Sequence, residues 1–303
     1  MANIINGKTL AAKIKNTIKE EIPLLEHKYG RRPSLCVIIV GNNSANQGYV
    51  RNKVKTGLSI GMDARLLALE DNINETELLK IIHVLNEDPL IDGILVQLPL
   101  PAHMNEERVI DAIAKNKDVD GFHTLNVGAL WQGTHCISPC TPKGIIQLIK
   151  TTEIPISGKT AVVVGRSNIV GKPVAKLLLN ENATVIMAHS YTEDLKKITL
   201  LADILIVAVG KEKIITADMI KPGAIVIDVG NTCNTEGKLV GDVDFEGACE
   251  VAGYITPVPG GVGPLTIAML MINTMECFLS HAEANADVSN LWKNISNARS
   301  GKD

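Results

Sequence analysis

A tyrosine and a lysine one helical turn apart are the first residues whose types and spacing suggest chemistry. They are Tyr49 and Lys53, in the segment YVRNKVK at residues 49–55. If this segment is helical, side chains at positions i and i+4 are neighbours on one face. A flat aromatic ring beside a primary amine can be the wall of a pocket next to a proton-transfer group. Lys55 is a competing lysine that spacing alone does not exclude.

Two polar residues further along the chain are candidates for the same site. Gln97 ends the apolar run IDGILVQL and is followed by prolines that stop strand pairing. Such a strand end lies at the carboxyl edge of an open α/β sheet, where ligands bind. Asp120 lies in KDVDGFH, after the next predicted helix. We expect both to converge with Tyr49 and Lys53 on a cleft, although each residue taken singly also fits a structural role.

A glycine-containing turn in the second half of the chain is typical of an anion site. In KTAVVVGRSNIVGKP, residues 159–173, a buried strand ends in Gly165 and a helix opens near Gly171. This arrangement directs backbone N–H groups and the positive end of the helix dipole at a pyrophosphate. The GxGxxG fingerprint is not met, because no glycine lies between the two. Glycines needed only for tight packing are the alternative interpretation.

The end of the next strand favours NADP over NAD. NAD sites place an Asp or Glu there, on the ribose 2′-hydroxyl. Residues 187–192 read MAHSYT and contain no carboxylate. Arg166 and Ser190 are instead suited to a 2′-phosphate, because a guanidinium matches phosphate oxygens with paired donors. The alternative is that Arg166 faces solvent.

The elements that must position these residues alternate between buried strands and amphipathic helices. In the first half we expect helix 8–29 with a bend or interruption near Pro23, strand 34–41, helix 44–60, strand 64–69, helix 75–86 and strand 91–98. In the second half we expect strand 159–165, helix 170–180, strand 183–188, helix 193–201, strands 203–210 and 223–230, and a helix from Pro264 to 281. Residues 121–144, with turn formers and both strand-like and loop-like pieces, are predicted to connect the two α/β units.

This alternation favours an α/β fold with parallel sheets covered by helices. We expect two α/β domains with a cleft between them, the second a Rossmann-like NADP-binding domain. The expected boundaries are 1–139 for the first domain, which carries Tyr49, Lys53, Gln97 and Asp120, and 140–269 for the nucleotide domain. The last helix and tail, about 270–303, are predicted to pack back on the first domain, with the tail from 282 exposed.

Composition points to small-molecule chemistry. The 303 residues are 46% hydrophobic, and 30 basic against 33 acidic side chains give a net charge of -3. We therefore expect no nucleic-acid or membrane partner. The chain shows no secretory or transit signal and no apolar run near membrane-spanning length, so we expect a cytoplasmic protein. Six scattered cysteines without a CxxC pair predict free thiols and no metal site.

Seven motifs occur in the order seen in one enzyme family: YVRNK, DGILVQLPLP, KDVDGFH, PCTPKG, GRSNIVGKP, GAIVIDVG and ITPVPGGVGP. Over about residues 3–280 the chain resembles the bifunctional methylenetetrahydrofolate dehydrogenase/cyclohydrolase family, in its short form without a formyltetrahydrofolate synthetase domain. The resemblance implies that 5,10-methylenetetrahydrofolate gives a hydride to NADP+ and that the methenyl product is hydrolysed to 10-formyltetrahydrofolate, in one-carbon metabolism. It also implies a homodimer formed through the nucleotide-binding halves.

The resemblance assigns a role to each matched residue. Tyr49 would stack on the folate ring, Lys53 would be the catalytic lysine, Gln97 would hold it, and Asp120 would hydrogen-bond the pterin. The other substrate-binding residues would be Val96, Leu98, Pro259, Gly260, Gly261, Val262 and Gly263. The NADP-binding residues would be Gly165, Arg166, Ser167, Ser190 and Asn231.

Three positions depart from the usual pattern of the family: Asn46 stands where Ser is general, Tyr191 where a basic residue is frequent, and Asn231 where an apolar residue is common. Three other functions stay open at this point. The chain could be a dehydrogenase without the hydrolase step, an NADP-linked dehydrogenase of a small hydroxy or amino acid, or a non-catalytic folate- or NADP-binding protein.

Overall fold

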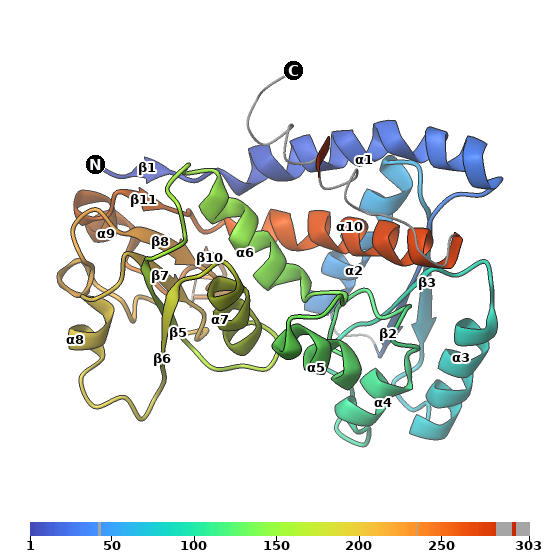
Figure 1. Cartoon of the computed structure of the whole chain (residues 1–303). Coiled ribbons are helices and arrows are strands. Elements are labelled where there is room, and N and C mark those ends of the chain that lie inside the picture. The colour runs from blue at the N-terminus through green and yellow to red at the C-terminus, as the bar shows by residue number, and fades with distance from the viewer. Residues whose placement is uncertain (42–43, 235, 283–292, 295–303) are drawn as a thin grey trace. The chain divides into compact units, whose positions relative to one another are not determined.

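The computed structural model describes residues 1–41, 44–234, 236–282 and 293–294 (Figure 1). The chain forms two compact units. Unit 1 comprises residues 1–12 and 139–269, and unit 2 comprises 13–138 and 270–303. Helices α1 (Gly7–Tyr29) and α10 (Val262–Ala282) contribute residues to both. Each unit contains a parallel sheet with helices packed on it, so the predicted α/β class is confirmed.

Among the described residues, unit 1 is built on a six-stranded parallel sheet in the order β1-β11-β8-β7-β5-β6. The strands are β1 Asn3–Ile4, β5 Thr160–Val164, β6 Thr184–Ala188, β7 Ile204–Val207, β8 Ile225–Asp228 and β11 Tyr254–Ile255. Residues 1–12 belong to this unit because β1 pairs with β11. A short antiparallel pair, β9 (Thr232–Cys233) and β10 (Leu239–Val240), follows β8.

Helices lie on both faces of this sheet (Figure 1). Alternate strand residues such as Val162, Leu205 and Val226 point to one face, where they pack with α8 (Leu195–Thr199), η1 (Ala217–Met219) and α9 (Phe245–Val251). Helices α6 (Cys140–Lys150) and α7 (Gly171–Asn180) contact β8, β5 and β6. The strand order reverses beside β5, because β6 lies on one side of it and β7 on the other. Ligands bind at such a switch point, beyond the carboxyl ends of the strands.

Unit 2 has, in its described part, a three-stranded parallel sheet in the order β3-β2-β4. The strands are β2 Ser34–Val40, β3 Asp63–Leu69 and β4 Gly93–Val96. The helices after α1 are α2 Ser44–Ser59, α3 Glu75–Glu87, α4 Glu106–Ala112 and α5 Thr124–Gln132. Strands β2 and β4 are buried throughout, whereas the edge strand β3 is partly exposed. The switch point of this sheet lies at the carboxyl ends of β2 and β4.

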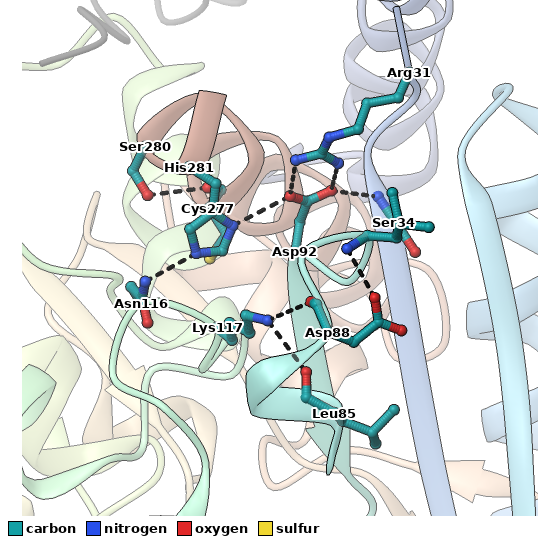
Figure 2. A network of polar contacts seen from close by, with 11 residues as sticks. Arg31, Ser34, Leu85, Asp88, Asp92, Asn116, Lys117, Cys277, Ser280 and His281 are labelled. Carbon is teal, nitrogen blue, oxygen red and sulfur yellow. Dashed lines mark hydrogen bonds and ion pairs between the residues drawn. The ribbon is translucent and has the colours of Figure 1, made fainter. Parts of the chain in front are cut away.

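A buried aspartate lies at the amino-terminal end of the strands in the same sheet (Figure 2). Asp92, just before β4, accepts two hydrogen bonds from the Arg31 guanidinium at 2.7 and 2.8 Å and one from the Ser34 N–H at 2.9 Å. His281, in the last turn of α10, contacts the same carboxylate through Nδ1 at 3.1 Å. Burial alone would raise the pKa of Asp92, but the hydrogen bonds from His281, Arg31 and Ser34 outweigh it and hold that pKa below its ordinary value.

Three local expectations differ from the structure. Helix α1 is not interrupted at Pro23 but continues from Gly7 to Tyr29, since the φ that proline fixes is compatible with a helix. Residues 121–144, expected to contain strand-like pieces, instead contain α5 and the start of α6. Helix α5 is capped by His123, whose Nδ1 accepts from the Leu125 N–H, and ends at Gly133 with φ of 76°. Helix α10 begins at Val262, two residues before Pro264.

Helix α10 also corrects the expectation that no apolar run approaches membrane-spanning length. Among the described residues, α10 is the one helix that is long and apolar enough to cross a membrane by length and composition. However, 78% of its most apolar window is buried inside the structure. A helix that is apolar on all sides is typical of a protein core. Its composition is thus explained by its packing.

Candidate active site

Lys53 is a buried residue of α2 whose side chain reaches the end of β4. Its side chain is only 5% exposed. Its Nζ lies 4.8 Å from the ring centroid of Tyr49, one turn earlier on the same helix, as the i, i+4 spacing predicts. The same Nζ donates a 2.9 Å hydrogen bond to Oε1 of Gln97. The structure therefore brings these three predicted site residues together.

Gln97 is fixed at both ends of its side-chain amide. It follows β4 directly, and its backbone N–H donates to the Ile38 carbonyl of β2 at 2.8 Å. Its Nε2 donates to the Leu98 carbonyl at 2.6 Å. Because Nε2 is engaged in that bond, Oε1 is the atom presented to Lys53. The amide accepts a hydrogen bond from the ammonium without neutralising it.

The turn that carries Asp120 is organised by a neighbouring aspartate, which sequence analysis did not single out. Asp118 is buried and accepts hydrogen bonds from the Gly121 N–H at 3.0 Å, the His123 N–H at 2.9 Å and Nδ2 of Asn126 at 2.9 Å. Burial raises the pKa of Asp118, and these donors oppose the rise. The available signal was its place in KDVDGFH, two residues before Asp120.

Asp120 itself is half-buried and electrostatically coupled to Lys53. Burial raises its pKa to about 6, the positive charge of Lys53 opposes the rise, and the charge of Asp118 adds to it. A carboxyl group that titrates near neutral pH can give or take a proton under physiological conditions. Asp120 is thus close enough to Lys53 for their charges to interact, as the predicted convergence requires.

The remaining predicted residues of unit 2 differ in how deeply they are buried. Val96 is buried in the hydrophobic core, and Leu98 is half-buried against it. Lys55 is exposed on α2, so of the two competing lysines Lys53 is the buried one that contacts Gln97. Asn46 belongs to α2, but its side chain lies outside the part that the structure describes.

In unit 1, the turn between β5 and α7 requires glycine at two positions. Gly165 has a φ of 123°, and a Cβ there would clash with the Ala208 carbonyl. A Cβ on Gly171 would clash with the Gly165 carbonyl. The Ser167 hydroxyl accepts from the N–H groups of Val170 and Gly171, both at 3.2 Å. Close packing therefore explains both glycines, while the start of α7 still directs its positive dipole end to this turn.

Arg166 and the segment after β6 meet at the ends of adjacent strands. The Arg166 guanidinium lies 5.5 Å from the ring centroid of Tyr191, and the His189 ring meets the Tyr191 ring edge-on at 6.2 Å. Ser190 is exposed between them. The structure thus places Arg166 against Tyr191, which is 79% exposed and directly follows Ser190 in the chain.

The last predicted residues lie in loops after β8 and β11. Asn231 is exposed between β8 and β9, and Pro259 is exposed after β11. Gly260 has a φ of 115°, and a Cβ on Gly261 would lie 2.7 Å from Cβ of Thr256, so the backbone itself requires both glycines. Val262 is buried at the start of α10, just after them. At Gly263 a Cβ would meet none of the described atoms within 4 Å.

These features define unit 1 as a dinucleotide-binding fold of the Rossmann class and unit 2 as an α/β unit in which a buried lysine is bonded to Gln97. Residues 5–120 match the family model described as tetrahydrofolate dehydrogenase/cyclohydrolase, catalytic domain. Residues 139–282 match its NAD(P)-binding domain. The chain belongs to the tetrahydrofolate dehydrogenase/cyclohydrolase family, which confirms the resemblance inferred from the seven motifs.

Relatives match over nearly their whole length. The bifunctional protein FolD of Listeria innocua is 56% identical over 276 residues, which is 91% of this chain and 97% of that protein. The crystal structure of the bifunctional FolD enzyme of Campylobacter jejuni has a TM-score of 0.90 at 47% identity, over 91% of this chain and 98% of that one. The FolD enzyme of Trypanosoma brucei, solved with NADP and an inhibitor, has a TM-score of 0.87 at 41% identity, over 91% of this chain and 97% of that one.

Proposed function

We propose that this chain is a bifunctional enzyme that oxidises 5,10-methylenetetrahydrofolate with NADP+ and hydrolyses the resulting 5,10-methenyltetrahydrofolate to 10-formyltetrahydrofolate. The observation that carries the proposal is the Lys53–Gln97 hydrogen bond at the carboxyl end of β4, beside Tyr49. Both domains of the family are present, and the relatives bear the names of bifunctional enzymes. In this proposal unit 1 carries the nucleotide and unit 2 carries the lysine pocket.

The dehydrogenase step uses the strand-end loops of unit 1. The proposed nucleotide-binding residues are Gly165, Arg166, Ser167, Ser190 and Asn231. The close-packed turn fits a pyrophosphate, because only glycine is accommodated at its first position and the helix dipole favours an anion there. When bound, NADP+ accepts the hydride that the methylene carbon releases. Arg166 with Ser190, and the absence of a carboxylate from the segment 187–192, support NADP over NAD.

The cyclohydrolase step uses the pocket of unit 2. Water adds to the methenyl carbon, so that a carbon–oxygen bond forms, a ring carbon–nitrogen bond breaks, the nitrogen gains a proton and one proton is released. Lys53 is the group that carries a proton between the water and the ring nitrogen. Gln97 orients Lys53, Tyr49 stacks on the folate ring and Asp120 hydrogen-bonds the pterin.

The remaining substrate contacts and the assembly are also proposals. Val96 and Leu98 shape the pocket, and the loop Pro259–Gly263 lets the backbone approach the folate. We propose a cytoplasmic homodimer that associates through unit 1. A cytoplasmic location is supported by the near-neutral charge and by the six cysteines, all free thiols in the described part of the chain. Light scattering of the purified protein tests the dimer.

A single coupled assay tests the proposed function. The purified protein is mixed with 5,10-methylenetetrahydrofolate and NADP+, and NADPH and the methenyl species are followed together by absorbance. Formation of NADPH with little methenyl build-up is expected. Accumulation of the methenyl species would mean that the protein is a dehydrogenase without cyclohydrolase activity. If neither NADP+ nor NAD+ is reduced, the proposed dehydrogenase activity is refuted.

A further inference from the structure

Asp242 is a fully buried residue that binds the loop after β7. Its carboxylate accepts hydrogen bonds from three consecutive backbone N–H groups: Oδ2 accepts from Val209 at 2.7 Å and Gly210 at 3.0 Å, and Oδ1 accepts from Lys211 at 2.9 Å. One side chain thus fixes the whole turn that leaves β7. Sequence analysis assigned no role to this aspartate.

A second buried aspartate holds Asp242 in place. Asp228 is the last residue of β8, and its Oδ1 accepts from the N–H groups of Gly230 at 2.8 Å and Asp242 at 2.9 Å. Its Oδ2 accepts from the Val243 N–H at 3.0 Å. Asp228 therefore fixes both the start of the loop after β8 and the segment that carries Asp242.

Each aspartate packs against a glycine from the segment that carries the other aspartate. A Cβ on Gly241, next to Asp242, would clash with Oδ2 of Asp228. A Cβ on Gly230, two residues after Asp228, would clash with the backbone nitrogen of Asp242 and lie 2.6 Å from its Oδ1. The segments DVG at 228–230 and GDV at 241–243 thus interlock, and each carboxylate needs the other segment's glycine.

A threonine extends this arrangement to a third strand end. Thr256, just after β11, is fully buried, and its Oγ1 accepts from the Asp228 N–H at 2.8 Å. Gly261 packs directly on Thr256. We call Asp228, Asp242 and Thr256 the strand-end clamp, because together they join the loops that follow β7, β8 and β11.

The strand-end clamp places two buried carboxylates next to the topological switch point, which indicates a functional role besides stability. Burial raises the pKa of Asp228, and the charge of Asp242 acts in the same direction, against the backbone N–H donors. Two adjacent buried carboxylates carry a desolvation cost that an apolar core would avoid. The loop that they fix also lies at the topological switch point, because Ala208 at the end of β7 packs on Gly165.

We propose that Asp242, held by Asp228, is a positioning residue for the nucleotide: it sets the loop 209–211 against the Gly165 turn. This inference rests on the proposed function of unit 1. Asp242 is fully buried and acts through the loop rather than by touching the cofactor. Loss of the clamp should therefore weaken the NADP-dependent step and spare hydrolysis of methenyltetrahydrofolate assayed without nucleotide.

The test replaces Asp242 by asparagine, which turns one acceptor oxygen into a donor facing a backbone N–H. We expect Asp242→Asn to raise the dissociation constant and KM for NADP+ by about 10- to 100-fold, since one or two buried hydrogen bonds are lost. Hydrolysis without nucleotide should change less than about twofold. The matched control is Asp218→Asn in the same unit, at an exposed ion pair with Lys196, which should leave both activities unchanged.

A parallel loss of both activities together with a lower melting temperature would overturn the proposal, because it would mark a purely structural role. So would an unchanged affinity for NADP+. If Asp242→Asn does not fold, hydrogen exchange of the native protein decides: amides 209–211 should be as protected as those of the central strands, and fast exchange there contradicts the clamp. Nucleotide titration and exchange need no turnover, so they test the clamp separately from the proposed reactions.

Discussion

The ammonium of Lys53 donates a 2.9 Å hydrogen bond to the side-chain oxygen of Gln97, across 44 residues of sequence. This bond joins α2 to the end of β4, at the switch point of the unit 2 sheet. The partner is a neutral amide, so it orients the lysine without forming an ion pair. A proton carrier needs this freedom, because its charge must change during the reaction.

Replacing Lys53 by methionine removes the proton carrier and keeps the length of the side chain. We expect Lys53→Met to lower the cyclohydrolase rate by about 100- to 10,000-fold, the usual contribution of general acid–base catalysis. NADP+ binding, measured by titration, should survive. Lys55→Met on the exposed side of the same helix is the control and should retain full activity. Hydrolysis at the normal rate in Lys53→Met would exclude Lys53 as the proton carrier.

Asp120 should leave a signature in the pH profile. Its pKa is raised to about 6, so the ionised form decreases as pH falls through that value. If the ionised carboxylate binds the pterin, kcat/KM should fall below pH 6 in the native enzyme. Asp120→Asn should lack this inflection, and an identical pH profile in the variant would rule out Asp120 as its source.

The same group predicts a change in stability with pH. The raised pKa means that the folded protein favours the protonated form, so this stabilisation is present below the ordinary pKa and is lost as pH rises through about 6. At pH 8 we expect Asp120→Asn to be more stable than the native protein by on the order of 1–3 kcal/mol. The difference should vanish near the ordinary carboxyl pKa, and urea unfolding at both pH values measures it.

Tyr191 should support Arg166 in binding the 2′-phosphate. Their contact at 5.5 Å is an exposed cation–π interaction, worth about 0.5–1 kcal/mol. We expect Tyr191→Ala to weaken NADP+ binding by about two- to fivefold, with no change for NAD+. Tyr191→Phe keeps the ring and should bind as the native protein does. Equal losses for both nucleotides would mean that the ring contacts a part that they share.

Asp92 should contribute stability without a direct part in catalysis. Asp92→Ala leaves the partly exposed Arg31 guanidinium and the buried Ser34 N–H without their acceptor, which should cost about 1–3 kcal/mol. The lowered pKa of Asp92 adds a pH dependence: its stabilisation is present above the ordinary carboxyl pKa and is lost as pH falls through the lowered value. Glu26→Gln, at an exposed pair with Arg32, is the control and should change stability by less than about 1 kcal/mol. A native-like unfolding curve for Asp92→Ala would contradict this assignment.

Sequence alone determined the features that depend on local spacing. The i, i+4 spacing of Tyr49 and Lys53 places them on one helix face, and β-branched runs bounded by glycine predict buried strands. The turn at Gly165 is readable because a strand, a glycine and a helix follow one another directly. These signals are local, since helical and strand periods repeat within a few residues.

Only the tertiary structure decided which distant residues meet. Lys53 rather than Lys55 contacts Gln97, which follows β4, and β1 joins the unit 1 sheet because it pairs with β11. The strand-end clamp is likewise not readable from the sequence, where Asp228 falls inside the predicted strand 223–230 and Asp242 follows 14 residues later with no local pattern that links the two. Strand order brings their segments together, and strand order is a property of the whole packed sheet rather than of any local period.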